Sequence, residues 1–492
     1  MTMKTLLILF VAPFLLASLA HAEAPVCSVT DEEHDPALRE MIYNIGGGEQ
    51  STYVYVEPDI ASFYRGQPPA STKVAPKHRG FSAKFINASN RRLALYWVEP
   101  GGKKHLMREH APFTASGTAS FPGHTFVFTP PNQPDEVIHT FVVKDYPDNI
   151  QLYDPYFVPG DAIQTQQNLA TLNDAERQKY QQWRDTINFH EQYLAFTGRS
   201  YLANYLREPP RHFMWRADYF GQEHWVTTQE TRFVAEPPSE LLNPIAAGKD
   251  RQLVEPLMKE YREPGVFNMT LKTLSCAPRA FEIPHFLSDA EVEHILKLAQ
   301  GIDLKLSSTG DVNAGEKVVT EDTRRTRTSF NSWVERERSP IVDAIYRRAA
   351  DLLRIDESLM RYRDANEHPE LPTRKSVAES LQLVHYAHAQ EYTAHHDFGF
   401  SRIEDDYQGA RFATLLLYLN EGMVGGETSF PRWVNAETFL PLNVKPEKGK
   451  AVLFYSQLPD GNLDDFSHHA ALPVTEGEKW LMNLWVWDPI YE

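Results

Sequence analysis

The sequence has few cysteines, no block of basic residues and only one long apolar run. Its basic side chains are scattered and outnumbered by acidic ones, 49 against 66, so the formal net charge is −17. This distribution argues against a surface for nucleic acid, and we expect no nucleic-acid partner. The sequence shows no internal repeat and no low-complexity tract. Its length of 492 residues is enough for roughly two to four globular domains.

The one long apolar run extends from Thr5 to Ala20 and follows a short start that contains Lys4. Ala20 and Ala22 place small residues at the −3 and −1 positions of a cleavage site, so we predict a signal peptide over residues 1–22. At about 15 residues, the run is shorter than the roughly 20 needed to cross a bilayer. We therefore expect a secretory-pathway protein, in the endoplasmic reticulum lumen or secreted, without stable membrane insertion after cleavage. An uncleaved signal anchor is the alternative.

Two cysteines, Cys27 and Cys276, remain after cleavage at this site. In an oxidising compartment one disulfide between them is expected. Two free buried thiols are the alternative, because the sequence does not show that the two side chains meet. Asn87 and Asn268 begin tripeptides of the form that accepts N-linked glycans, which is compatible with a glycoprotein.

After a segment of residues 23–79, residues 80–156 show short aromatic and β-branched stretches separated by turn residues. This pattern is typical of a small all-β domain, and we predict a β-sandwich. The predicted strands are residues 81–86, 93–98, 125–128 and 137–143.

Residues 157–275 are predicted to be a helical and irregular connecting region. A helical pattern begins at Asn173 and is expected to run to about Arg207, because Pro209 and Pro210 would end it. Residues 210–275 are interrupted by proline and glycine, so we expect an irregular connection there.

Residues 276–492 combine two predicted helices with a series of strands. Ser288 and Glu291 form a capping box that opens a helix to about residue 300, and a second helix covers about 340–353. This order favours a C-terminal jelly-roll, or double-stranded β-helix, with supporting helices, in a multidomain α+β chain. The strands are predicted at residues 381–386, 413–419, 451–455 and 480–487.

Three chemically suited side chains, His395, Asp397 and His469, are the candidate metal ligands. An imidazole and a carboxylate two residues apart on an extended strand project to one face. With a second imidazole from a distant strand, they would occupy one triangular face of an octahedral iron(II) and leave three positions open for a cosubstrate and O₂. Lys479, ten residues after His469, could pair with the far carboxylate of 2-oxoglutarate.

The segment that holds these residues resembles the prolyl 4-hydroxylase family. Residues 386–397 look like the family's strand with the first two iron ligands. The resemblance covers about residues 277–489 with order and spacing kept. Its other matching stretches are residues 325–333, 409–420, 425–431, 449–454, 467–470 and 478–480.

The resemblance implies that His395, Asp397 and His469 bind iron. It also implies that Lys479 holds 2-oxoglutarate. The hydroxyls of Tyr386 and Thr428, which match family positions in the cosubstrate pocket, would help Lys479.

Tyr392, Arg411 and Trp485 match positions that line the family's peptide groove. The chain departs from the family at His396, where a bulky or aromatic side chain is usual, and at His468 beside the third ligand. Because side chains alternate along a strand, we expect both extra imidazoles to point away from the metal.

The activity implied by the resemblance is hydroxylation of prolyl residues in peptides or proteins, coupled to oxidative decarboxylation of 2-oxoglutarate to succinate and CO₂. The enzyme would be a procollagen-proline 4-dioxygenase-like dioxygenase that uses iron(II), 2-oxoglutarate, O₂ and ascorbate. Two alternatives remain: the same chemistry on lysyl or another side chain, and a catalytically dead adaptor that binds hydroxyproline.

In the predicted β-sandwich, residues 85–87, 96–97 and 120–128 resemble the β-domain of the von Hippel–Lindau tumour suppressor, which binds hydroxyproline-containing peptides. The resemblance implies that Ser120 and His124 contact the hydroxyl of the ligand, and that Phe126 takes the place of a tryptophan that packs on its ring. The alternative is a structural module in which Ser120 and His124 stabilise their own loop.

Overall fold

The computed structural model describes residues 80–144, 149–203, 207, 209–242, 251–307, 326–364, 366–371, 374–398, 410–433 and 442–488. The predicted signal peptide, the segment 23–79 and Cys27 lie outside the described residues. The signal sequence and the disulfide between Cys27 and Cys276 therefore stay predictions. Within the described ranges, no helix combines the length and the apolar character that crossing a membrane requires.

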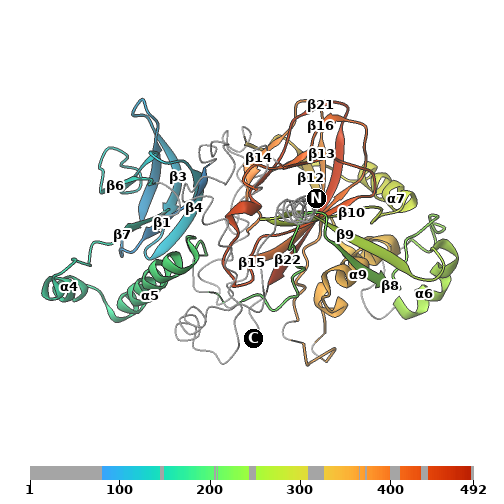
Figure 1. Cartoon of the computed structure of the whole chain (residues 1–492), viewed down its shortest axis with the longest axis horizontal. Helices are drawn as coiled ribbons and strands as arrows, with labels where there is room; N and C mark the ends of the chain where they lie inside the picture. Colours follow the sequence, from blue (N-terminus) through green and yellow to red (C-terminus); the bar gives the residue numbers. More distant parts are fainter. Residues whose placement is uncertain are drawn as a thin grey trace, which may run out of the picture.

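The first seven strands, which we call the N-terminal β-unit, form two sheets (Figure 1). One sheet has the order β4-β1-β7 and the other β3-β2-β5-β6. Phe85 of the first sheet packs on Phe126 and Phe141 of the second, with ring centroids 4.5 and 5.5 Å apart. The strands are β1 (Phe81–Asn87), β2 (Leu93–Val98), β3 (Lys104–His110), β4 (Thr114–Ser120), β5 (Thr125–Thr129), β6 (His139–Val142) and β7 (Ile150–Tyr153).

The two candidate glycosylation sites differ in their surroundings. Asn87 is fully buried, and its Nδ2 donates hydrogen bonds to the carbonyl oxygens of Arg91 and Ala111. A glycan cannot be attached to this atom in the folded protein. Asn268 is exposed, so glycosylation there stays a prediction.

Two helices, α4 (Ala162–Leu169) and α5 (Asp174–Thr197), follow the β-unit. Asn173 caps α5 and forms a capping box with Glu176. The predicted end at Arg207 was wrong, because Gly198 adopts a left-handed conformation with φ 69° and ends the helix after Thr197.

The C-terminal region is built on a nine-stranded sheet with the order β11-β12-β13-β22-β15-β19-β10-β9-β8. A four-stranded sheet, β14-β20-β17-β18, and the pair β16-β21 complete it. The strands of the large sheet are β8 (Glu223–Thr228), β9 (Phe267–Cys276), β10 (Arg279–Ile283), β11 (Lys305–Leu306), β12 (Phe330–Val334), β13 (Leu381–Tyr386), β15 (Ala410–Tyr418), β19 (Ala451–Tyr455) and β22 (Lys479–Asp488). The others are β14 (Tyr392–His395), β16 (Val424–Gly425), β17 (Thr428–Phe430), β18 (Leu442–Val444), β20 (His469–Ala471) and β21 (Val474–Glu476).

Strands β8 and β9 correct the prediction that residues 210–275 are irregular. β9 pairs with β10 on one side and with β8 on the other, so both strands extend the large sheet. The alternation of buried Met269, Leu271 and Thr273 along β9 is the signal for this strand in the sequence.

Three helices lie beside the large sheet: α6 (Arg251–Met258), α7 (Asp289–Gln300) and α9 (Pro340–Leu353) (Figure 1). The capping box predicted for Ser288 and Glu291 is present in α7. Ile345 of α9 shares a buried cluster with Leu415 and Leu417 of β15. The intervening residues of β15 face the other way, into the space between the two sheets, and this alternation places Tyr418 in the candidate site described next.

Candidate active site

The structure brings His395, Asp397 and His469 together between the two sheets. β14 pairs with β20 so that His395 lies opposite His469, and Asp397 follows directly after β14. The Nε2 atoms of His395 and His469 lie 3.6 and 3.5 Å from the two carboxylate oxygens of Asp397. All three ligand atoms fall within 4.8 Å of one another, which is the spacing that a single metal ion requires.

Backbone carbonyl groups orient both imidazoles. His395 Nδ1 lies 2.8 Å from the carbonyl oxygen of Thr393, and His469 Nδ1 lies 2.9 Å from that of Ser467. A carbonyl oxygen can only accept a hydrogen bond, so each Nδ1 carries a proton and Nε2 is the nitrogen that faces Asp397. Such contacts to the second nitrogen are typical of metal-binding histidines.

The electrostatics of the cluster suit a cation. Burial and the neighbouring His469 hold the pKa of His395 well below its usual range, so this imidazole is neutral. Burial acts to raise the pKa of the Asp397 carboxyl, but His469, His395 and Arg411 outweigh it, and the pKa lies below its usual range. Two imidazoles and one ionised carboxylate are the donor set that fits iron(II).

Two further side chains hold the Asp397 carboxylate. Thr414 Oγ1 and Trp485 Nε1 each donate a 3.0 Å hydrogen bond to Oδ2 of Asp397. Trp485 was predicted to line the peptide groove, and the structure places its ring edge against the carboxylate, with 6% of the residue exposed. Thr414 was not predicted. Leu416 and Tyr418, two and four residues further along the strand, face inward, and this alternation is the signal that Thr414 faces inward as well.

Lys479 is fully buried at the start of β22, and its amine lies over the ring of Tyr386, a residue on which the charge of Asp397 acts. Among the described residues, no polar atom lies within hydrogen-bonding distance of its Nζ. The Nζ lies 5.4 and 5.6 Å from the ring centroids of Tyr386 and Tyr418, and burial lowers the pKa of the amine to about 7. A buried amine without a partner is costly, so this geometry fits an anionic ligand that supplies one.

Tyr386 and Thr428, the predicted helpers of Lys479, are both linked to it by the surrounding contacts. Tyr386 is paired with Lys479 in the register of β13 and β22. Thr428 Oγ1 accepts a 2.7 Å hydrogen bond from the hydroxyl of Tyr418, a residue that the sequence analysis did not single out. Gly426 packs closely on Lys479, because a Cβ on it would lie 3.3 Å from Cδ of Lys479.

The other predicted groove residues lie around the cluster. Tyr392 stacks on His395, with ring centroids 3.5 Å apart, and the Arg327 guanidinium lies 4.5 Å from the Tyr392 ring centroid. Arg411 lies 3.8 Å from the Trp485 ring centroid and pairs with Glu379 at 2.6 Å. Arg411 is thus held in a structural ion pair next to the site.

The two extra histidines point away from the cluster. His396 Nε2 lies 3.2 Å from Oδ1 of Asp465, and its ring stacks on Phe398. The His468 ring lies 4.7 Å from that of His396, on the same side. Neither belongs to the group of residues that could hold a metal, within the part of the chain that the structure describes.

In the N-terminal β-unit, Ser120 Oγ lies 3.3 Å from Nδ1 of His124. The His124 ring is 5.7 Å from that of Trp97 and 5.4 Å from that of Phe121, which is 47% exposed. Phe126 is only 1% exposed and belongs to the core of the unit. An aromatic group therefore surrounds His124, and Phe126 lies beneath it rather than at the surface.

Comparison with known proteins identifies relatives of this chain. Residues 381–487 match the family model of the 2OG-Fe(II) oxygenase superfamily. The chain is 31% identical over 265 residues to probable prolyl 4-hydroxylase 7 of Arabidopsis thaliana, covering 51% of this chain and 76% of the relative. It is 33% identical over 233 residues to prolyl 4-hydroxylase 2 of the same plant, covering 44% of this chain and 69% of the relative.

Among solved structures, a viral collagen prolyl hydroxylase from Paramecium bursaria Chlorella virus-1, in complex with 2OG, is 24% identical. The match covers 42% of this chain and 95% of the viral chain, with a TM-score of 0.30. The identity and coverage of the plant relatives, together with the superfamily match, establish the family. The chain belongs to the prolyl 4-hydroxylase family and is a prolyl hydroxylase-like 2-oxoglutarate- and iron(II)-dependent dioxygenase.

Proposed function

We propose that this protein hydroxylates prolyl residues of peptides or proteins and uses iron(II), 2-oxoglutarate and O₂. The observation that carries the proposal is that one domain holds both the cluster of His395, Asp397 and His469 and a fully buried Lys479 amine without a hydrogen-bond partner. A metal cluster alone fits many reactions. A buried cation in the same domain selects an anionic cosubstrate.

The residues have separate roles in this proposal. His395, Asp397 and His469 would hold the metal through Nε2, a carboxylate oxygen and Nε2. Lys479 pairs with the far carboxylate of 2-oxoglutarate, and the hydroxyls of Tyr386 and Thr428 are placed to contact the same group. Bound iron would supply the activation of O₂ and the oxidation of 2-oxoglutarate to succinate and CO₂.

Other residues of the protein would orient the metal ligands and exclude water, so that the oxidation is directed to the substrate. Trp485 and Thr414 hold Asp397 in one orientation, and the buried rings of Tyr386 and Tyr418 exclude water from the pocket around Lys479. Tyr392 and Arg411 lie at the rim of the metal site and are the residues that we assign to the peptide. Ascorbate as a reductant and a substrate from the secretory pathway complete the proposal, the latter on the strength of the predicted signal peptide.

Turnover of 2-oxoglutarate tests the proposal. Purified protein with iron(II), ascorbate and O₂ should release succinate in the presence of proline-rich peptides, and Asp397→Ala should abolish the release. Mass spectrometry of the peptides separates the alternatives: added oxygen on lysine would show the second chemistry. No succinate with any peptide, from wild-type protein that binds iron, would indicate a catalytically dead adaptor and overturn the proposal.

Binding of hydroxyproline by the N-terminal β-unit is a second candidate function. It is favoured by the Trp97 and Phe121 rings beside His124, since aromatic surfaces suit pyrrolidine rings. The full chain carrying Asp397→Ala, which cannot convert the ligand, would be titrated with paired proline and hydroxyproline peptides. Equal affinities, or no effect of His124→Ala on the hydroxyproline peptide, would show that these residues only stabilise their own loop.

A further inference from the structure

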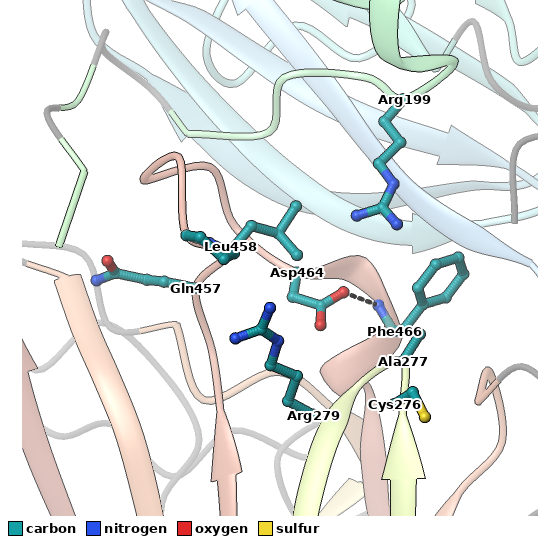
Figure 2. A pocket seen from close by; sticks show the side chains of 9 residues that line it. Arg199, Cys276, Ala277, Arg279, Gln457, Leu458, Asp464 and Phe466 are labelled. Carbon is teal, nitrogen blue, oxygen red and sulfur yellow. Dashed lines mark hydrogen bonds between the residues drawn. The ribbon is translucent and has the colours of Figure 1, made fainter. Parts of the chain in front are cut away.

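The loop of residues 456–468, which leads directly into the third candidate ligand His469, is held by the N-terminal half of the chain. The Tyr193 hydroxyl on α5 donates a 2.6 Å hydrogen bond to Oδ2 of Asp460. The Leu202 N–H donates to Oδ1 of Asn462 at 2.8 Å. Figure 2 shows the same boundary: Arg199, which follows α5, faces Asp464 and Phe466 of this loop across a small cavity.

The carboxylate of Asp465 is the centre of this contact. Its two oxygens accept hydrogen bonds of 3.0 and 3.2 Å from the backbone N–H of Ser82 in β1. Arg432 Nη1 lies 2.6 Å from Oδ1, and His396 Nε2 lies 3.2 Å from the same atom. One side chain therefore joins the N-terminal β-unit, the segment after β17 and the segment that carries the first two candidate ligands.

The position of Ser82 in its sheet explains why its N–H is available. β7 pairs with β1 only from Lys84 to Asn87, so it does not reach Ser82. A strand-edge N–H that is left without a neighbouring strand needs another acceptor when it is buried, and Ser82 is 7% exposed. Asp465 supplies this acceptor from the C-terminal region.

Asp465 also adjoins both chain segments that carry the candidate metal ligands. His396 lies between His395 and Asp397 in the chain, and the backbone carbonyl of Asp465 lies 3.2 Å from the same His396 Nε2. On the other side, Asp465 opens the short turn that ends at Ser467, whose carbonyl orients His469. A shift of this turn would rotate His469 relative to the His395 and Asp397 pair.

We propose that Asp465 is a positioning residue for the iron site, and that the N–H of Ser82 makes the N-terminal β-unit part of the support of that site. The proposal rests on the proposed metal-binding role of His395, Asp397 and His469. Loss of an outer partner of a metal ligand weakens metal binding by about 10- to 100-fold in general, and Asp465 acts on two ligand segments at once.

Metal titration of the full chain tests the role of Asp465. Co(II) serves as the probe, because its visible absorption reports both its affinity and its coordination geometry without turnover. Asp465→Ala should raise the Co(II) dissociation constant at least about tenfold and change the absorption spectrum. Asp465→Asn, which keeps an oxygen acceptor for Ser82 and Arg432, should recover most of the affinity and the wild-type spectrum. Wild-type affinity and spectrum in Asp465→Ala would overturn the proposal.

A matched pair of variants tests the contribution of the β-unit without a change to the C-terminal region. Ser82→Pro removes the N–H that Asp465 accepts, whereas Ser82→Ala keeps it. The proposal expects weaker Co(II) binding in Ser82→Pro only, and equal Co(II) affinity in the two variants would overturn it. If thermal unfolding shows that Asp465→Ala does not fold, the comparison of Ser82→Pro with Ser82→Ala becomes the test of the proposal.

Asp397→Ala separates this proposal from the function on which it rests. If wild-type protein binds Co(II) and Asp397→Ala does not, the metal site stands, and the Asp465 and Ser82 variants then judge the present inference alone. If Asp397→Ala binds Co(II) as well as wild type, the proposed metal site itself is wrong, and the positioning role of Asp465 is overturned with it.

Discussion

Trp485 Nε1 donates a 3.0 Å hydrogen bond to Oδ2 of Asp397, a residue 88 positions away in the sequence. The bond uses the carboxylate oxygen that also faces His469. A carboxylate held in this way presents its lone pairs to a metal in one orientation, which lowers the cost of ordering it on binding.

Trp485→Phe should therefore weaken iron(II) binding by roughly tenfold, because the N–H is lost while a smaller aromatic ring remains. Trp487→Phe is the matched control, since Trp487 Nε1 donates to Glu379 and not to Asp397. Anaerobic titration with iron(II) measures both. Similar iron affinities for the two variants would contradict a role of the Trp485 hydrogen bond.

Lys479→Met should raise the dissociation constant of 2-oxoglutarate at least about tenfold, because the charge-assisted contact to the far carboxylate is lost. Metal binding should be unaffected, since Lys479 is not among the three ligand candidates. Lys448→Met is the control, as this more exposed lysine pairs with Asp289. Calorimetric titration of the Co(II)-loaded variants measures the affinity, and unchanged binding in Lys479→Met would place the cosubstrate elsewhere.

The same contact predicts a pH dependence of 2-oxoglutarate binding. Burial lowers the pKa of Lys479 to about 7 in the protein without cosubstrate, and a bound carboxylate favours the ammonium and raises this pKa again. Below pH 7 the ammonium is already present. Above pH 7 binding requires uptake of a proton, so the dissociation constant should rise by up to about tenfold for each pH unit. A wild-type profile as flat between pH 6 and 9 as that of Lys479→Met would exclude this coupling.

Gly426→Ala should raise the KM for 2-oxoglutarate severalfold. A Cβ at this position would lie 3.3 Å from Cδ of Lys479 and from Cγ2 of Val474, so the lysine must move. Gly422→Ala provides the control, because Gly422 has a similar positive φ but no atom within 4 Å of an added Cβ. Both variants carry backbone strain of about 1 kcal/mol or more, and only Gly426→Ala should change KM. If Gly426→Ala and Gly422→Ala had equal KM values for 2-oxoglutarate, backbone strain alone would explain any change, and the contact with Lys479 would have no role.

Local signals in the sequence predicted the elements whose cause is local. Ser288 and Glu291 predicted the start of α7, because a capping box acts within four residues. The alternation of residues 381–386 predicted β13 with its observed bounds. Gly198 shows the limit of such signals: the helical pattern continues past it, and a single left-handed residue ends α5 earlier.

The sequence by itself determined the types of chemical group in the site. Two imidazoles, one carboxylate and one amine at family-like spacing predict a site of His395, Asp397, His469 and Lys479. Covalent chemistry decides which atoms can bind a metal or an anion, and this depends on residue type alone.

Only the tertiary structure decided which atoms support these groups. The hydrogen bonds from Trp485 to Asp397 and from the Ser82 N–H to Asp465 join residues 88 and 383 positions apart. Neither has a pattern in the sequence, because the contacts depend on how separate sheets pack and on which strand edge is left open. Packing is a property of the whole chain, and it makes Trp485, an expected substrate contact, a partner of a candidate iron ligand.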